Sequence, residues 1–468
     1  MTYCNKTTSL LIVMILLAFS LTAQNKQARF WLTTADRTFL FQLQPTTLAF
    51  KKQSNDLPTV TVDESTSYQT IDGFGFALTG GSAQHMIKMS PAARKELIKE
   101  LFTTEKNNIG LSYLRVSIGA SDLNEKVFSY DDLPEGETDI ELKKFELGPD
   151  RLDVIPVLKE ILAVAPGIKI LASPWSPPAW MKTIFDTRGG RLQPAFYRTY
   201  AAYFVKYIQG MKKAGITIDA VTVQNEPLHP GNNPSLLMPA PDEAEFIKNH
   251  LGPAFKAAGL TTKIILYDHN ADRPDYPIYI LDDAAAAKFI DGSGFHLYGG
   301  DIEALSDVHN AHPNKNLYFT EQMVVDRPGA TGINIAWPIK NVMIGATRNW
   351  CKNVLLWNLA ADPEFKPFTD RGGCNSCQGA VTINKDIVTR NHAYYVMAHV
   401  SKFVRPGSKR IASNNLDAVS TVAFKTSVGT KVLLAVNNSK STQTFNILFK
   451  GEMITTSLKA GAVATYNW

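Results

Sequence analysis

Two glutamates, each of which closely follows a short apolar segment, are the residues of this chain best suited to chemistry. Glu226 follows the segment 220–224 and Asn225, and Glu321 follows the segment 316–320. Short apolar runs of this kind are typical of buried parallel strands, so both carboxylates are predicted at strand ends. Two carboxylates that meet across one glycosidic bond can cleave it, because one protonates the departing oxygen and the other attacks the anomeric carbon.

The central part of the chain alternates short apolar segments with helical ones. Ser90 and Pro91 suit the cap and first turn of a helix over 90–101. Three more helices are predicted over 152–164, 196–214 and 242–258, and eight strands over 71–76, 113–118, 169–173, 220–224, 263–267, 294–297, 316–320 and 353–357. Eight such units over roughly 320 residues favour an α/β fold, a (β/α)8 TIM barrel. A doubly wound open sheet is the alternative, but no glycine-rich phosphate loop follows these strands.

At both ends of the chain, apolar and polar residues alternate with the two-residue period that is typical of β-strands. Residues 29–62 and 410–468 alternate apolar and polar positions, with turn residues between the apolar runs. Each segment is too small to fold alone, so we expect the two to pair into one β-sandwich appended to the barrel. The predicted division is a signal peptide at 1–23, sandwich segments at 24–66 and 401–468, and the barrel at 67–400.

The first residues have the pattern of an export signal. Lys6 precedes an apolar run over 10–21, and small or polar residues follow. The run is roughly half as long as a membrane span, which favours a cleaved secretory peptide over a retained anchor. No later segment reaches roughly 18 uninterrupted apolar residues, so the mature chain is predicted to lack an integral membrane span and to be periplasmic or secreted.

The overall charge gives no indication of a nucleic-acid partner. The formal net charge is only +5 over 468 residues, and it falls by one when Lys6 leaves with the leader. No RNA-binding or helix-turn-helix signature is present. We therefore predict no nucleic-acid partner.

Three cysteines remain once Cys4 leaves with the leader. Cys374 and Cys377 have the two-residue spacing of zinc and redox sites, but no second pair of this kind exists. In an exported protein a local disulfide is the preferred interpretation, ahead of free thiols or a metal site. No other motif for a metal or cofactor is present, and none is predicted.

The predicted strand ends carry side chains that suit a sugar. Reactive residues of such barrels lie at the C-terminal ends of the strands and in the loops that follow. Carboxylates and amides there can bind hydroxyl groups, and indole faces can cover the C–H side of a pyranose. The residues at these positions are Arg115, Asp122, Trp175, Asn225, Glu226, Asp268, His269, His296, Tyr298, Glu321 and Trp357.

The two glutamates are predicted to differ in role. Glu226 is the better acid candidate, because adjacent Asn225 can bond a sugar 2-hydroxyl, a contact that strengthens at the transition state. An acid must hold its proton near neutral pH, so we expect the pKa of Glu226 to lie above the ordinary glutamate value. Glu321 is then the nucleophile, with Arg115 to keep it ionised.

Each of these residues, taken alone, has a plainer explanation. Glu226 could be a loop residue bound by backbone amides, and Arg115 could be a structural ion-pair partner. Trp175 could pack a proline-rich loop, and a histidine on an apolar strand, such as His296, is more often a core residue. The hypothesis of a sugar site therefore rests on the joint pattern.

Seven segments of the chain, in this order and spacing, resemble a known family. They are Gln69-Thr-Ile-Asp-Gly-Phe-Gly75, Leu114-Arg-Val116 with Ser121-Asp122, Leu171-Ala-Ser-Pro-Trp-Ser-Pro-Pro178, Val221-Thr-Val-Gln-Asn-Glu-Pro227, Phe295-His-Leu-Tyr298, Phe319-Thr-Glu321 and Trp357-Asn-Leu359. The whole chain after the leader resembles family 30 glycoside hydrolases, which include glucosylceramidases and endo-β-1,6-glucanases.

The resemblance implies both the fold and the roles of the site residues. It implies a (β/α)8 barrel joined to a β-sandwich made from both termini, and retention of anomeric configuration with Glu226 as acid/base and Glu321 as nucleophile. It also implies a glucose-binding subsite lined by Asp122, Trp175, Asn225, His296, Tyr298 and Trp357.

Two details favour one branch of this family. The lysosomal glucosylceramidase branch has Ser before its nucleophile, whereas this chain has Thr320, and the loop 371–379 with Gly372-Gly-Cys374 looks more like the β-1,6-glucanase branch. The preferred interpretation is an exported retaining β-glucanase. A glucosylceramidase and a non-catalytic carbohydrate-binding protein are the alternatives, so the predicted partner is a carbohydrate or a glycolipid.

Overall fold

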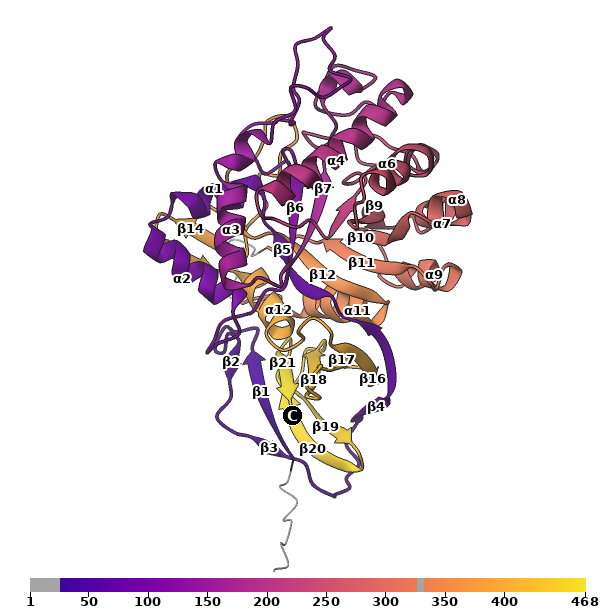
Figure 1. Cartoon of the computed structure of the whole chain (residues 1–468). Coiled ribbons are helices and arrows are strands. Elements are labelled where there is room, and N and C mark those ends of the chain that lie inside the picture. The colour runs from indigo at the N-terminus through magenta and orange to yellow at the C-terminus, as the bar shows by residue number, and fades with distance from the viewer. Residues whose placement is uncertain (1–25, 326–331) are drawn as a thin grey trace, which may run out of the picture.

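The structure is a computed structural model of the chain and describes residues 26–325 and 332–468. A ring of strands surrounded by helices forms the larger domain, and a smaller β-domain lies beside it (Figure 1). The predicted leader at 1–23 lies outside the described residues. Within those residues, no helix is long and apolar enough to cross a membrane.

Eight parallel strands close into a barrel, which confirms the predicted (β/α)8 architecture. The strands pair in chain order, and β12 pairs with β5 to close the ring. All eight coincide with predicted strands, although β8 is shorter and β10 longer than expected. Their bounds are β5 Gly73–Ala77, β6 Tyr113–Ile118, β7 Lys169–Pro174, β8 Ala220–Thr222, β9 Lys263–Ala271, β10 Ile290–Gly300, β11 Asn316–Glu321 and β12 Cys351–Asn358.

The barrel interior is built in layers. One apolar layer consists of Tyr113, Leu171, Ala220, Ile265, Tyr318 and Leu355. Because side chains alternate along a strand, the residues two positions further on also face the interior, nearer the C-terminal mouth of the barrel. Arg115, Ser173 and Thr222 occupy these positions and are buried. A polar layer therefore lies directly above an apolar one.

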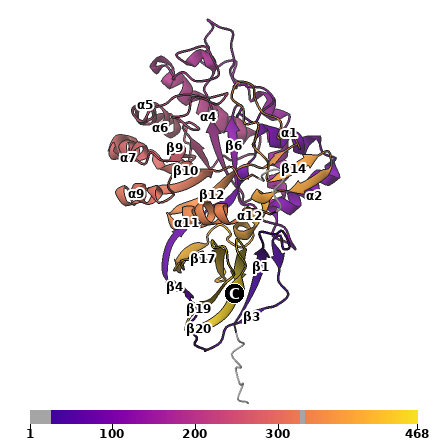
Figure 2. The same cartoon turned by 180° about the vertical axis from the view of Figure 1, so that it is seen from behind.

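Helices cover the outside of the ring (Figures 1 and 2). α2 begins at Pro91, and the Ser90 side chain caps it by accepting a hydrogen bond from Ala93 N, as predicted. The bounds of the α-helices are α1 Gly80–Lys88, α2 Pro91–Phe102, α3 Val154–Val164, α4 Tyr197–Lys213, α5 Ala240–Phe246, α6 Gly252–Ala257, α7 Asp275–Asp282, α8 Ala284–Ala287, α9 Ala304–Ala311, α10 Ala336–Pro338, α11 Gly345–Arg348 and α12 His392–Ser401. The 3₁₀ turns are η1 Gly148–Arg151, η2 Ala179–Met181 and η3 Pro194–Phe196, and the π-helices are η4 Ile247–Leu251 and η5 Ile339–Ile344.

The predicted helices over 90–101, 152–164 and 196–214 are confirmed by α2, α3 and α4. The helix predicted over 242–258 is also confirmed, as one continuous helical segment in which the π-helical turn η4 lies between α5 and α6. Pro253 lies in the first turn of α6 and has no backbone N–H to continue the hydrogen-bond ladder. The wider π-helical turn accommodates that interruption.

The smaller domain is a β-sandwich made from both ends of the chain, as expected. Hydrogen bonds link its strands in the order β2-β1-β21-β18-β17-β16-β4-β19-β20, with β3 beside β1. In Figure 1 the indigo strands of the N-terminus and the yellow strands of the C-terminus lie together. Their bounds are β1 Gln27–Thr33, β2 Gln42–Leu43, β3 Leu48–Ala49, β4 Thr59–Thr70, β16 Lys409–Ser413, β17 Val419–Lys425, β18 Lys431–Asn437, β19 Gln443–Phe449, β20 Glu452–Leu458 and β21 Val463–Asn467.

The sandwich strands nearest the barrel are buried on both faces. On β17 and β18, Ala423 and Leu433 belong to the core of the sandwich. Their neighbours Phe424 and Leu434 belong to the core of the barrel domain. Because adjacent side chains of a strand point to opposite faces, these strands join the two hydrophobic cores.

One barrel helix also bonds to both chain ends. His399 of α12 is fully buried, and its ring lies between Thr465 of β21 and Thr33 of β1, at 2.9 and 2.8 Å. The Thr465 hydroxyl donates its hydrogen to the backbone carbonyl of His399, so it must accept a hydrogen bond from Nδ1–H of the His399 ring. The other ring nitrogen, Nε2, then accepts a hydrogen bond from the Thr33 hydroxyl. This arrangement needs a neutral imidazole, and burial lowers the pKa of His399 to about 3.

We predict that His399 makes the chain sensitive to acid. Its folded pKa lies below that of an unfolded histidine, so its contribution to stability is complete above about pH 6.5 and is lost as the pH falls toward 3. Between pH 7.5 and 4.5 this one group is expected to remove roughly 2 to 3 kcal/mol from the free energy of unfolding. Urea unfolding of the native chain and of His399→Gln at both pH values checks this; an equal loss in the two proteins would contradict it.

Candidate active site

Arg115 of β6 holds the polar layer at the barrel mouth together. Its side chain is fully buried and donates to Glu321 Oε2 at 2.5 Å and to Asp268 Oδ2 and Asn225 Oδ1 at 2.7 Å each. The Nε group donates to Ser173 Oγ at 3.1 Å. Four acceptors from four different strands or strand ends therefore converge on one guanidinium.

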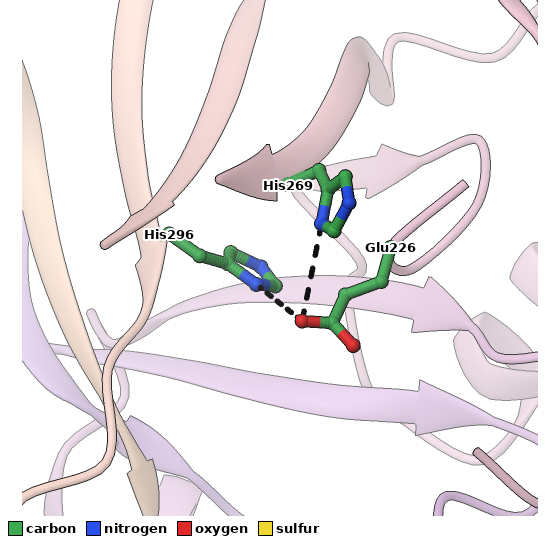
Figure 3. Close-up of side chains that lie close together, drawn as sticks. All are labelled: Glu226, His269 and His296. Carbon is green, nitrogen blue, oxygen red and sulfur yellow. Dashed lines mark hydrogen bonds and ion pairs between the residues drawn. The ribbon is translucent and has the colours of Figure 1, made fainter. Parts of the chain in front are cut away.

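The two predicted glutamates face each other across a histidine. His296 Nδ1 lies 3.4 Å from Glu226 Oε1 and 4.0 Å from Glu321 Oε1. The other ring nitrogen, Nε2, lies 3.1 Å from Asp268 Oδ1, which fixes the plane of the ring. Figure 3 shows His296 and His269 pointing toward the same oxygen of Glu226. The carboxylates of residues 226 and 321 therefore belong to one site.

The backbone around these side chains is unusual. Glu226, Tyr267 and Asp268 have φ values of 47°, 74° and 61°, in the left-handed region that non-glycine residues seldom adopt. Glu226 N donates to Asp268 O at 3.0 Å, so the strained segments after β8 and within β9 support each other. An irregularity of β10 between Phe295 and His296 turns the imidazole toward them.

The charges of the site are strongly coupled. Burial opposes ionisation of Asp268, yet Arg115 and His296 hold its pKa well below the ordinary value. Burial also opposes the charged form of His296, but the surrounding carboxylates, that of Glu321 first, raise its pKa to about 9. His296 is therefore cationic at neutral pH, and it lies between two glutamates.

The pKa values of the two glutamates move in opposite directions. Burial raises the pKa of Glu321 above its ordinary value, and the attraction of His296 and Arg115 offsets only part of that rise. Burial also disfavours ionised Glu226, but the cation at His296 outweighs it and lowers the pKa of Glu226. The expectation that the pKa of Glu226 lies above the ordinary value is therefore wrong for this arrangement, because the histidine beside it carries the proton.

The remaining predicted residues lie around this centre. Asp122 is buried, its Oδ1 has no partner among the described residues, and burial raises its pKa to about 8. Tyr298 donates to Glu321 Oε1 at 2.9 Å and is 43% exposed, which leaves it at the open side of the site. Trp175 and Trp357 are buried, with ring centroids 5.4 Å apart, and both lie beside the Arg115 guanidinium.

A disulfide loop supports the two tryptophans. Cys374 and Cys377 are bonded to each other, in the segment between β13 Ala360–Ala361 and β14 Val381–Asn384, which pairs with β15 Ile387–Arg390. Cys377 packs in one buried cluster with Trp175 and Trp357. The loop therefore forms part of the wall behind the site.

The comparisons with known proteins agree with this geometry. The family profile of the glycosyl hydrolase family 30 TIM-barrel domain matches residues 71–404, and that of the family 30 beta sandwich domain matches residues 407–466. The chain belongs to glycosyl hydrolase family 30. It is thus an enzyme that hydrolyses glycosidic bonds of carbohydrates.

Relatives within family 30 differ in their named activities. The endo-1,6-beta-D-glucanase neg1 of Aspergillus fumigatus is 34% identical over 81% of this chain and 83% of its own length. The lysosomal acid glucosylceramidase of Mus musculus is 29% identical over 81% and 77%. A solved endo-beta1,6-glucanase superposes with a TM-score of 0.86 at 35% identity, over 95% of this chain and 99% of its own.

Sequence reasoning missed one residue of this family 30 site, Glu243, and the connections that Asp268 makes within it. Asp268 and His269 were noted at a strand end, but nothing in the sequence indicated that Asp268 bonds both Arg115 and His296. Glu243 of α5 was missed entirely, because an acidic residue in a surface helix gives no sequence signal. It is fully buried, accepts from Tyr267 N at 3.1 Å and from Tyr276 Oη at 2.6 Å, and has a pKa raised to about 7 by burial.

We predict that Glu243 positions the site through Asp268. Its bond to Tyr267 N holds the left-handed segment that presents Asp268, and an unpaired buried N–H costs about 1–3 kcal/mol. Glu243→Leu is therefore expected to lower kcat at least 10-fold with little change in KM, and Glu243→Gln, which keeps an acceptor, to restore most of kcat. Steady-state kinetics check this, with Glu245→Leu on the exposed face of the same helix as control. A purely structural role would instead lower Tm and leave kcat unchanged.

Proposed function

We propose that this family 30 enzyme is a retaining β-glycoside hydrolase of β-1,6-linked glucan, with Glu226 as acid/base and Glu321 as nucleophile. The observation that carries the proposal is the single His296 nitrogen that lies 3.4 Å from one carboxylate and 4.0 Å from the other. Because both carboxylates lie near the same nitrogen, they can flank one glycosidic bond. A retaining pair is separated by about 5 Å, whereas inverting enzymes need roughly 6.5–9.5 Å for an intervening water.

The proposed reaction has two displacements. A Glu321 oxygen bonds to the anomeric carbon while the bond to the leaving oxygen breaks, and Glu226 gives a proton to that oxygen. Glu226 then takes a proton from water, whose oxygen displaces Glu321 from the same carbon. Each displacement inverts the anomeric centre, so the product retains the configuration of the substrate.

Neighbouring groups prepare the two carboxylates for these steps. Arg115 and Tyr298 each bond one oxygen of Glu321, which holds the nucleophile in a single orientation. Cationic His296 keeps a proton beside Glu226 Oε1, so the acid is next to its proton source. Arg115 also fixes the side-chain amide of Asn225 next to the acid.

The sugar subsite is proposed from the groups that surround the carboxylates. Asp122 is the strongest candidate among them, because it is buried and its Oδ1 atom has no hydrogen-bond partner among the described residues, so that oxygen is suited to bind a sugar hydroxyl. The full proposed set is Asp122, Trp175, Asn225, His296, Tyr298 and Trp357.

The choice of β-1,6-glucan rests on the relatives. Three fungal proteins named endo-1,6-beta-D-glucanase are 32–34% identical to this chain, whereas the proteins named glucosylceramidase are 26–29% identical. A second candidate function, hydrolysis of glucosylceramide, is favoured only by those more distant matches. Binding of carbohydrate without cleavage, the third hypothesis, has no support in a site that holds both glutamates.

We further propose that residues 1–23 are a cleaved leader and that the mature enzyme is periplasmic or secreted. In the mature chain, the barrel at 67–400 lies between the sandwich segments 24–66 and 401–468. The apolar run over 10–21 supports export. The Cys374–Cys377 disulfide supports an oxidising compartment. We also propose that the enzyme has no nucleic-acid partner.

The roles of the two glutamates predict different kinetic losses. Glu321→Gln removes the nucleophile, so kcat should fall roughly 10³-fold or more on every substrate. Glu226→Gln removes the acid, so kcat should fall by about 10²–10⁴ on glucan but much less for the first step on aryl glycosides whose leaving group needs no proton. Burst kinetics with aryl glycosides measure this, with exposed Glu96→Gln as control. Equal losses of both variants on both substrate classes would exclude this division of roles.

The substrate and the stereochemistry can be tested together. Incubation of the exported protein with β-1,6-glucan is expected to release β-anomeric sugar before mutarotation, because two inversions restore the configuration. Proton NMR at early times distinguishes the β- from the α-anomer. Early α-anomer would refute the retaining mechanism, and cleavage of glucosylceramide but not of β-1,6-glucan would replace the proposed substrate with the second candidate.

A further inference from the structure

Three side chains at the barrel mouth converge on one point that the proposed reaction does not fully explain. Glu226 Oε1 lies 3.4 Å from His296 Nδ1 and 3.9 Å from His269 Nδ1. Figure 3 shows the carboxylate and both rings aimed at the same space. Within residues 26–325 and 332–468 this is the one group of at least three histidine, cysteine or carboxylate side chains whose ligand atoms all lie within 4.8 Å of one another.

His269 supplies the decisive observation. Its side chain is 7% exposed, and its Nδ1 atom has no hydrogen-bond partner within the part of the chain that the structure describes. A buried polar atom without a partner is costly, so it marks a position that a ligand can satisfy.

The second histidine presents Nδ1 to the same carboxylate oxygen, and an ion bound there would displace the proton that cationic His296 holds on that nitrogen. His296 Nε2 bonds to Asp268 Oδ1 at 3.1 Å, which leaves Nδ1 facing Glu226. A carboxylate on the far nitrogen of a ligating histidine fixes the ring and strengthens its donor atom. Glu321 Oε1, 4.0 Å from the same Nδ1, adds negative charge nearby.

We propose that Glu226, His269 and His296 form a binding site for a divalent transition-metal ion, and that an ion bound there inhibits hydrolysis. Two imidazole nitrogens and one carboxylate oxygen suit Zn²⁺ and exclude a preference for Mg²⁺ or Ca²⁺, which take oxygen ligands. Zn²⁺ bonds of 2.0–2.2 Å require ligand atoms about 3.4 Å apart in a tetrahedral site. Glu226 Oε1 and His296 Nδ1 already have that separation, and His269 Nδ1, at 3.9 Å from the same oxygen, must move closer. The inhibitory part rests on the proposed function, because the ion would occupy the acid/base carboxylate.

Zn²⁺ binding can be measured without reference to hydrolysis. Isothermal titration of the folded, EDTA-treated chain with ZnCl₂ should show one ion per chain in the native protein, and Co²⁺ should give the visible absorption of a four-coordinate ion. His269→Leu should raise the Kd for Zn²⁺ at least 10-fold. His312→Ala should leave it unchanged, because His312 precedes β11 and so lies at the opposite end of the barrel, beside Asp282.

A second measurement connects binding to inhibition. Zn²⁺ should inhibit the native enzyme, EDTA should restore activity, and His269→Leu should tolerate at least 10-fold more Zn²⁺. A native-like Kd in His269→Leu, or the absence of a site in the native chain, would overturn the proposal. Should that variant not fold, Glu226→Gln provides the same binding test. Zn²⁺ binding without any effect on turnover would instead refute the assignment of Glu226 as acid/base, which separates failure of the proposed function from failure of the metal site.

Discussion

The ion pair between Arg115 and Asp268 is the interaction on which the rest of the site depends. Both side chains are fully shielded from solvent, 2.7 Å apart, and a buried pair of this kind is stable only when its remaining donors and acceptors are also satisfied. Arg115 meets this condition with Glu321, Asn225 and Ser173, and Asp268 with His296 and Thr222. The charges that the reaction uses therefore belong to a network that links six strands, and loss of either partner leaves the other buried without this ion pair.

That network exists because the barrel alternates its side chains with a period of two. The apolar layer formed by residues such as Leu171 and Ala220 fills the lower interior, and the next inward positions, Ser173 and Thr222, carry hydroxyl groups instead. The barrel interior is apolar in one layer and hydrogen-bonded in the next, so the packed apolar layer supports the polar side chains at the mouth. The left-handed backbone at Glu226 and Asp268 is stabilised at that boundary by the hydrogen bond from Glu226 N to Asp268 O.

The sequence was sufficient for the architecture, and most of the residues that it singled out lie together at the barrel mouth. Continuous apolar runs predicted all eight barrel strands, and Ser90-Pro91 predicted the start of α2. The helix over 242–258 was predicted as well, but the π-helical turn η4 within it was not. The central position of Asp268, the burial of Glu243 and the unpartnered nitrogen of His269 depend on contacts between residues distant in the chain. The prediction that the pKa of Glu226 is raised was wrong for the same reason. The direction of its pKa shift is set by His296, which lies 70 positions away in the chain.

The pairing of β1 with β21 joins the first described strand of the chain to the last. A ribosome adds about 5–20 residues per second, so on the order of tens of seconds separate the emergence of these two strands. During that interval the edge of β1 has no mate, and an open edge of this sort is a template for pairing with other chains. The sandwich can therefore close only after the last strand has been made, so its folding is completed after synthesis of the whole chain.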